Sequence, residues 1–132
     1  MLPDYQILET ESGRYLTLRT DTVISAQLRT RGSFELHLSK IAEAVFRLRG
    51  GGALVDIGAN IGTFSVPVAR ATGCEVHAFE AQRVISQVLS ANFILNRISN
   101  GHVHHVMLGA ASHEEGCLLP IPDYGELGNF GA

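Results

Sequence analysis

Apolar and polar side chains alternate in two short stretches near the start of the chain. These stretches, residues 5–9 and 15–19, flank a turn signal at residues 11–14. Strict alternation predicts strands with one buried and one solvated face, so we expect a β-hairpin here. Asp21 and Thr22 follow, and they fit either a second turn or the cap of a short helix.

Before the middle of the chain, the spacing of apolar residues changes from every second residue to that of a helix. Residues 5–38 are β-rich on this reading, whereas apolar residues between Leu36 and Leu48 recur at helical spacing. Three glycines at residues 50–52 end this amphipathic helix. We interpret residues 1–49 as a hairpin and helix leader that is too small to bury a core by itself.

From residue 53 onward strands and helices alternate. The predicted strands cover residues 53–57, 75–79, 102–108 and 116–121, the predicted helices cover residues 61–71 and 83–98, and residues 122–131 form a glycine-rich loop. The first strand is apolar on both faces, which is typical of a buried parallel strand. The fold class is therefore α/β, with residues 50–132 forming a partial Rossmann-like, doubly wound parallel sheet.

Half of such a sheet leaves the edge of its first strand without a partner. An open apolar edge is a template for pairing with another chain. We expect that the chain is truncated, that the hairpin covers this edge, or that the protein forms a homodimer through it.

The stretch around the first strand end has the form strand, glycine loop, helix. Its pattern is D-x-G-x-N-x-G, from Asp56 through Gly58 and Asn60 to Gly62. A dinucleotide motif would need glycine at Asn60 and at Thr63, and neither position has one. The loop therefore favours a ligand other than a dinucleotide.

The fuller string V-D-I-G-A-N-I-G-T-F, residues 55–64, resembles motif I of class I S-adenosylmethionine (SAM) methyltransferases, and more specifically the FkbM type. The resemblance covers residues 50–131. It implies that Asp56 holds the ammonium end of SAM, and that the loop lines the methionine and ribose. The loop residues implied are Gly58, Ala59, Asn60, Gly62 and Thr63. Alternatively, Asp56 fixes the loop by accepting backbone amides, and Asn60 serves only the turn.

A second carboxylate ends the second predicted strand. Glu80 stands 22 positions after Gly58, where an acid can accept both hydroxyls of a ribose. The A-F-E-A string around it also resembles the FkbM type, and it implies that Ala81 and Gln82 lie close to the adenosine. The alternative role for Glu80 is to cap the following helix electrostatically.

Other polar residues are weaker candidates. Family members often have a polar side chain near the adenine, for which Ser112 and His113 are the local candidates, and Asn129 resembles part of a loop over the cleft. The resemblance also puts Glu35 and His37 near the cleft mouth, but a solvated helix start is the favoured reading for both. His102, His104 and His105 have no adjacent cysteine or carboxylate in sequence to complete a metal site, so we interpret them as a solvated strand face and predict no metal. We identify no catalytic base.

Composition and charge limit the classes of binding partner. The 132 residues are 45% hydrophobic and carry a formal charge of −3, which argues against a nucleic-acid partner. Two cysteines are too few for a disulfide framework. The N-terminus has no secretory signal and no apolar run is long enough to span a membrane, so we expect a cytoplasmic protein.

Three functions fit these observations. The first is a SAM-dependent FkbM-type methyltransferase, with SAM as cofactor and O-methylation of a small-molecule or saccharide acceptor. In FkbM-type proteins an acidic strand follows this region and faces the acceptor. The sequence therefore leaves open whether this chain alone catalyses methyl transfer. The second is a non-catalytic SAM- or nucleotide-binding remnant that acts as an interaction module, and the third is an NAD-binding domain, which the missing glycines disfavour.

Overall fold

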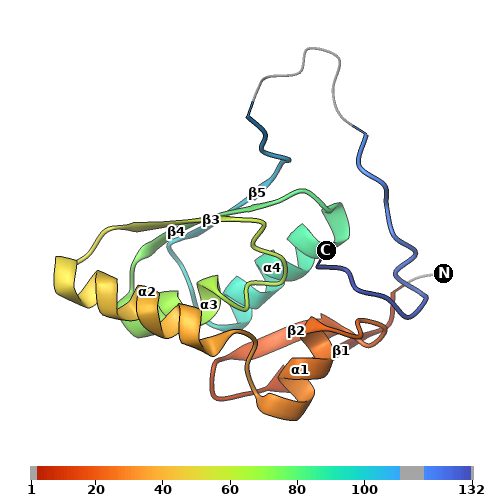
Figure 1. Cartoon of the computed structure of the whole chain (residues 1–132), viewed down its shortest axis with the longest axis horizontal. Helices are drawn as coiled ribbons and strands as arrows, with labels where there is room; N and C mark the ends of the chain where they lie inside the picture. The colour runs from red at the N-terminus through yellow and green to blue at the C-terminus, as the bar shows by residue number, and fades with distance from the viewer. Residues whose placement is uncertain (1–2, 111–117, 132) are drawn as a thin grey trace.

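The computed structural model describes residues 3–110 and 118–131, and it has three layers (Figure 1). A parallel sheet forms one layer, three helices lie beneath it, and a hairpin with a short helix forms the third. The elements in chain order are β1 (Tyr5–Glu9), β2 (Arg14–Leu18), α1 (Ile24–Arg31), α2 (Leu36–Arg49), β3 (Ala53–Ile57), α3 (Ser65–Thr72), β4 (Glu75–Glu80), α4 (Arg83–Leu95) and β5 (Gly101–His105). None of the helices in these ranges is long and apolar enough to cross a bilayer.

The sheet has the order β3-β4-β5, with all strands parallel. In this register Ile57 lies opposite Phe79, and Glu80 lies opposite His105. The carboxyl ends of the first two strands therefore meet at one edge of the sheet. This is the arrangement that the alternating sequence pattern predicts, and it brings the glycine loop next to Glu80.

Only one face of this sheet is covered by the described residues. α3 and α4 pack against the face that contains Leu54, Val76 and Ala78, all of which are buried. On the opposite face the side chains of Val55 and Ile57 are 59% and 67% exposed. The prediction that β3 is buried on both faces is therefore wrong, because α3 and α4 lie on the same side (Figure 1).

β3 is an edge strand, as expected for half of a doubly wound sheet. The hairpin does not cover it, because β1 and β2 form a separate two-stranded sheet in which β2 packs against α4. A homodimer through this edge stays a prediction.

The leader contains one helix more than the β-rich reading of its first part predicted. α1 occupies residues 24–31, and Asp21 caps its start by accepting hydrogen bonds from the amides of Val23 (3.1 Å) and Ser25 (2.6 Å). Of the two roles considered for Asp21, the structure thus has the helix cap. The predicted hairpin and the amphipathic helix, here α2, are confirmed.

Several element boundaries differ from the sequence prediction, and α4 ends at Leu95 and not at residue 98. α3 begins at Ser65 and not at residue 61, because Gly62 has φ +91°, which no α-helix accommodates. β5 ends at His105, three residues early. Residues 118–121 are not a strand, and the rest of that predicted strand lies outside the described residues, as do Ser112 and His113.

A buried amide joins the leader to the α/β half. Asn92, on α4, is fully buried; its side chain accepts from the amide of Leu16 (2.6 Å) and donates to the carbonyls of Leu16 (3.1 Å) and Ile61 (2.8 Å). One side chain therefore holds the hairpin, the end of the glycine loop and α4 together.

We expect Asn92→Ala to lower the free energy of unfolding by about 2–4 kcal/mol, because it leaves several buried backbone groups without partners. Urea unfolding followed by circular dichroism measures this. Asn96→Ala is the matched control, since the half-buried Asn96 also bonds the hairpin backbone, but through hydrogen bonds that are exposed to solvent, and it should cost about 1 kcal/mol or less. Equal losses for the two variants would contradict the role given to Asn92.

Candidate functional site

The tips of β3 and β4 are joined by the carboxylate of Glu80. Its side chain is only 6% exposed, and its two oxygens accept hydrogen bonds from the amides of Asn60 (3.0 Å) and Gln82 (2.8 Å). The amides of Gly58 and Ala59 both donate to the Phe79 carbonyl, at 2.9 and 3.0 Å. The two strand ends thus converge as predicted, and Glu80 also fixes Gln82, the residue that precedes α4.

The bend between β3 and α3 depends on three residues with positive φ: Gly58 (+77°), Asn60 (+48°) and Gly62 (+91°). A Cβ atom on Gly62 would lie 2.8 Å from Leu89 Cδ1, so this glycine allows the loop to pack closely on α4. A Cβ on Gly58 would meet nothing within 4 Å. Gly58 therefore serves the turn and leaves open space beside the backbone.

That open space belongs to a cavity of about 480 Å³ between the bend and the leader. This volume lies within the range of small-molecule sites. The lining residues are Val23, Ile24, Phe34, Glu35, Leu38, Asp56, Gly58, Ala59, Asn60, Thr63, Phe64, Asn129 and Gly131. They include two carboxylates and, among the residues that the structure describes, no lysine, arginine or histidine. Such a wall suits a cationic or neutral ligand group better than a phosphate.

Asp56 is one of the two carboxylates that line this cavity. It is half-buried, and removal from water raises the pKa of its carboxyl group above the ordinary value of 3.8. The hydroxyl of Ser65 donates a hydrogen bond to the carboxylate and lowers the pKa, whereas the nearby charge of Glu80 raises it further. A cation docked beside Asp56 would relieve this unfavourable charge.

The C-terminal segment, residues 118–131, closes the other side of the site. The carbonyl of Phe130 accepts hydrogen bonds from the side-chain amides of Gln82 (2.8 Å) and Asn60 (3.3 Å), and the Tyr124 hydroxyl donates to Gln82 Oε1 (2.8 Å). Tyr124 and Phe130 are buried and meet edge to face. Burial raises the pKa of Tyr124, as does the charge of Glu80.

The predicted site residues thus fall into two groups. Asp56, Gly58, Ala59, Asn60 and Thr63 line the cavity. Gly62, Glu80, Ala81 and Gln82 do not line it: Gly62 packs on α4, and Gln82 lies beneath the C-terminal segment.

Sequence reasoning missed most of the wall that the leader supplies, and it missed Tyr124 and Phe130. Glu35 and Asn129 were considered, and both line the cavity. Two aromatic residues inside a glycine-rich loop were a signal that this loop packs against something.

A second hollow, about 750 Å³, lies between the hairpin turn, α2 and α3. It is larger, but neither the bend nor the two strand ends line it. Its charges are mixed, with the acids Glu9, Glu11 and Glu43 facing the bases Arg31, Lys40 and Arg70. We therefore place the site at the smaller cavity, where the strand ends meet.

Comparison with known proteins identifies the fold. No model of a known protein family and no curated protein matches the sequence. Among solved structures, the chain is similar to Pyrococcus horikoshii TYW2 in complex with MeSAdo, with a TM-score of 0.62, 18% identity and coverage of 80% of this chain and 37% of that one. A SAM-dependent methyltransferase from Agrobacterium tumefaciens gives a TM-score of 0.58 at 16% identity, covering 80% and 33%.

A tRNA methyltransferase from Methanocaldococcus jannaschii is similar as well, with a TM-score of 0.53, 14% identity and coverage of 82% and 31%. The chain spans about a third of the length of these structures. The partial Rossmann-like fold predicted from the sequence is thus confirmed, as part of the class I methyltransferase fold.

We expect Asp56→Asn to change how stability depends on pH. In the wild type the raised pKa means that the folded chain loses stability, relative to the unfolded chain, as pH rises from about 4 through the folded-state pKa. Asparagine removes this loss, so the free energy of unfolding of the variant should rise relative to wild type between pH 4 and pH 7.

Denaturant unfolding at a series of pH values measures this difference. Asp4→Asn is the matched control, because Asp4 is exposed just before the hairpin and, within the described part of the chain, its ion pair is with Arg19. If the free energies of unfolding of Asp56→Asn and wild type changed in parallel with pH, ionisation of Asp56 would not destabilise the folded chain, and the prediction would be wrong.

Proposed function

We propose that this chain is the SAM-binding half of a methyltransferase of the FkbM type, which O-methylates a small-molecule or saccharide acceptor. The observation that carries the proposal is the cavity beside the glycine bend, with Asp56 at its wall and no basic side chain among its described lining residues. The solved structures supply the fold, and the D-x-G-x-N-x-G pattern supplies the ligand class.

The bend favours SAM over a dinucleotide. A pyrophosphate at such a bend is bound by free backbone amides. Here the amides of Gly58, Ala59 and Asn60 all have partners within the protein. The ammonium group of SAM needs an acceptor instead, and the half-buried carboxylate of Asp56 is one.

Glu80 and Gln82 would hold the adenosyl end. Each carboxylate oxygen of Glu80 accepts one amide and can accept a further hydrogen bond, so the ribose hydroxyls can share them. In the structure the Phe130 carbonyl accepts hydrogen bonds from the side-chain amides of Asn60 and Gln82. We infer that this carbonyl stands where an acceptor atom of the ligand would lie, so binding displaces residues 130–131 from the rim.

Transfer needs alignment of the acceptor and removal of its proton. When bound, SAM supplies a methyl group on a positively charged sulfur, which an acceptor oxygen attacks in line. Glu35 lines the same cavity at the start of α2, with φ +47°, a strained value for a residue other than glycine. It is our candidate for the group that accepts the proton of the acceptor hydroxyl.

A small acceptor suits the chain better than a nucleic acid. The tRNA methyltransferase named above acts on tRNA, but this chain carries a formal charge of −3 and offers no basic excess for a phosphate backbone. A transfer assay with saccharides, small alcohols and tRNA as acceptors tests this choice.

Isothermal titration with SAM, S-adenosylhomocysteine and NAD tests the cofactor. We expect binding of the two adenosyl amino acids and none of NAD. Asp56→Asn should weaken binding about 10- to 100-fold, because the ammonium loses a charged acceptor. Affinity in the wild type should also rise with pH as Asp56 ionises, and the variant should lose this dependence.

Asp4→Asn is the control here too and should bind like wild type. Binding of NAD alone would contradict the proposal. Binding of SAM without transfer to any acceptor would instead support the non-catalytic remnant.

A further inference from the structure

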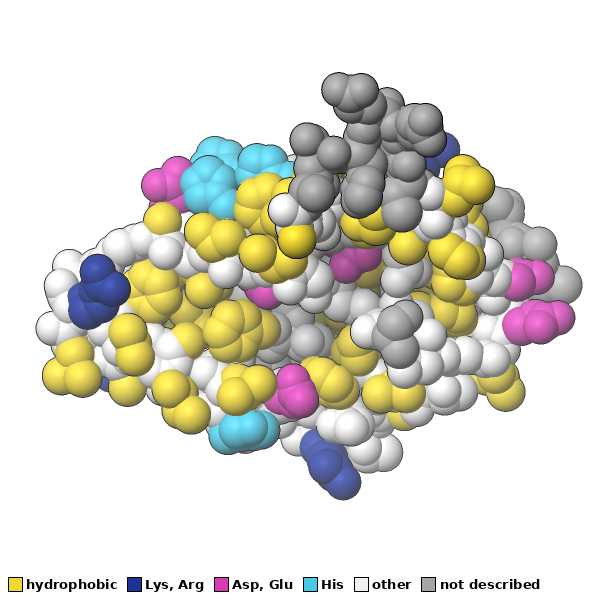
Figure 2. All heavy atoms as spheres, turned by 45° about the horizontal axis from the view of Figure 1, so that its top comes forward, with side chains coloured by type: hydrophobic (Ala, Val, Ile, Leu, Met, Phe, Trp, Pro, Cys, Tyr) yellow, Lys and Arg dark blue, Asp and Glu magenta, His cyan; other side chains and the backbone are white. Residues whose placement is uncertain are grey.

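A row of histidines crosses the open face of the sheet. His77 on β4 pairs in register with His102 on β5, and Phe79 pairs with His104. Because side chains alternate along a strand, Glu75, His77 and Phe79 share one face of β4, and His102 and His104 share the same face of β5. Figure 2 shows the histidine side chains gathered on this face beside an acidic group.

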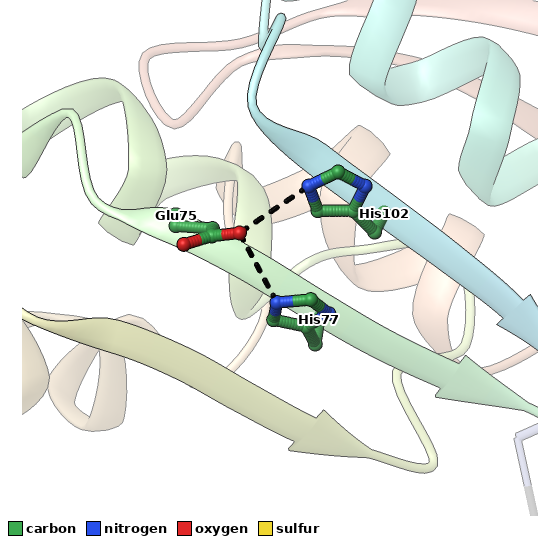
Figure 3. A group of neighbouring side chains, drawn as sticks. All are labelled: Glu75, His77 and His102. Atoms are coloured by element: carbon green, nitrogen blue, oxygen red, sulfur yellow. Dashed lines mark ion pairs between the residues drawn. The ribbon is translucent and has the colours of Figure 1, made fainter.

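Three of these side chains converge on one point (Figure 3). Glu75 Oε1 lies 3.3 Å from His77 Nε2 and 3.4 Å from His102 Nε2. One ligand atom from each of the three residues lies within 4.8 Å of the others. The side chains are 35–52% exposed, so an ion in solution can reach them.

We propose that Glu75, His77 and His102 bind a divalent transition metal ion, zinc above all. Imidazole and carboxylate together are a common zinc ligand set, with three protein ligands and one open position for water. With metal–ligand bonds of about 2.0–2.2 Å, the ligand atoms of a tetrahedral site lie roughly 3.3–3.6 Å apart. The two measured separations from Glu75 Oε1 already have this length. The two histidine nitrogens lie within 4.8 Å of each other.

His104 positions the ring of His77 through the ring nitrogen that faces away from Glu75. His77 Nδ1 lies 3.2 Å from His104 Nε2, in hydrogen-bond contact, so His104 can set the tautomer that leaves Nε2 of His77 free for the metal. His104 is itself held by stacking on Phe79, with ring centroids 4.5 Å apart. The rings of His77 and His102 stack nearly parallel, with centroids 4.9 Å apart.

The sequence prediction of no metal rested on the lack of an adjacent carboxylate. It considered only the sequence neighbours of His102, His104 and His105, whereas Glu75 stands two residues before His77 on the same face of β4 and faces His102 across the strand pair. The cluster is independent of the proposed SAM site. Glu75 opens β4 and Glu80 ends it, which separates them by about 16 Å along the strand.

Titration of the tag-free 132-residue chain with Zn²⁺, and with Co²⁺ followed by visible absorption, tests the proposal. We expect one ion per chain, a four-coordinate Co²⁺ spectrum, and a higher Tm with Zn²⁺ than without it. His77→Ala, His102→Ala and Glu75→Gln should each weaken binding about tenfold or more, and His104→Ala should do so through the position of His77.

His37→Ala is the matched control: it removes an exposed histidine on α2, outside the cluster, and should leave the affinity unchanged. Circular dichroism of each variant confirms that it is folded, and Glu75→Gln at an exposed position provides a test even if a histidine variant does not fold. An affinity weaker than about 1 mM, or equal losses for His37→Ala and the cluster variants, would overturn the proposal.

Discussion

One buried carboxylate determines the geometry of this chain at the place where the sheet meets the proposed ligand. Glu80 ends β4 and accepts the amides of Asn60 and Gln82, so it fixes the bend after β3 and the start of α4 together. A buried charge is tolerable here because two backbone donors satisfy it. Without this junction the amide of Asn60, at the centre of the bend, would lose its partner at the tip of the sheet.

The rest of the site depends on two other contacts. Asn92 holds the hairpin and the end of the bend against α4, which brings the leader to the cavity. Asp56 is kept out of water beside the same cavity, a cost that a cationic ligand would offset. The carboxylate of Glu80 is satisfied by two backbone amides, whereas that of Asp56 is poorly solvated. A bound cation would therefore stabilise Asp56 and not Glu80.

Much of this fold could be predicted from the sequence, because long periodic segments dictate their own structure. The hairpin, α2, β3, β4 and α4 follow from apolar spacing alone, and the meeting of Glu80 with the bend follows from parallel strand ends. The exposed face of β3 could not be predicted, because an apolar run does not reveal which side the helices cover. Some contacts join residues far apart in the sequence and leave no local pattern to predict them from. These are the hydrogen bonds of Tyr124 and Phe130 with Gln82, and the contact of Glu75 with His102.

The most direct test of the account is where an adenosyl ligand contacts the chain. Nuclear magnetic resonance spectra of the ¹⁵N-labelled chain, recorded with increasing S-adenosylhomocysteine, report this for each backbone amide. We predict large shifts at residues 58–60, 81–82 and 130–131, and none at residues 102–104. Shifts confined to the hollow lined by Ser12, Gly32 and Lys40, with the bend unaffected, would contradict the account.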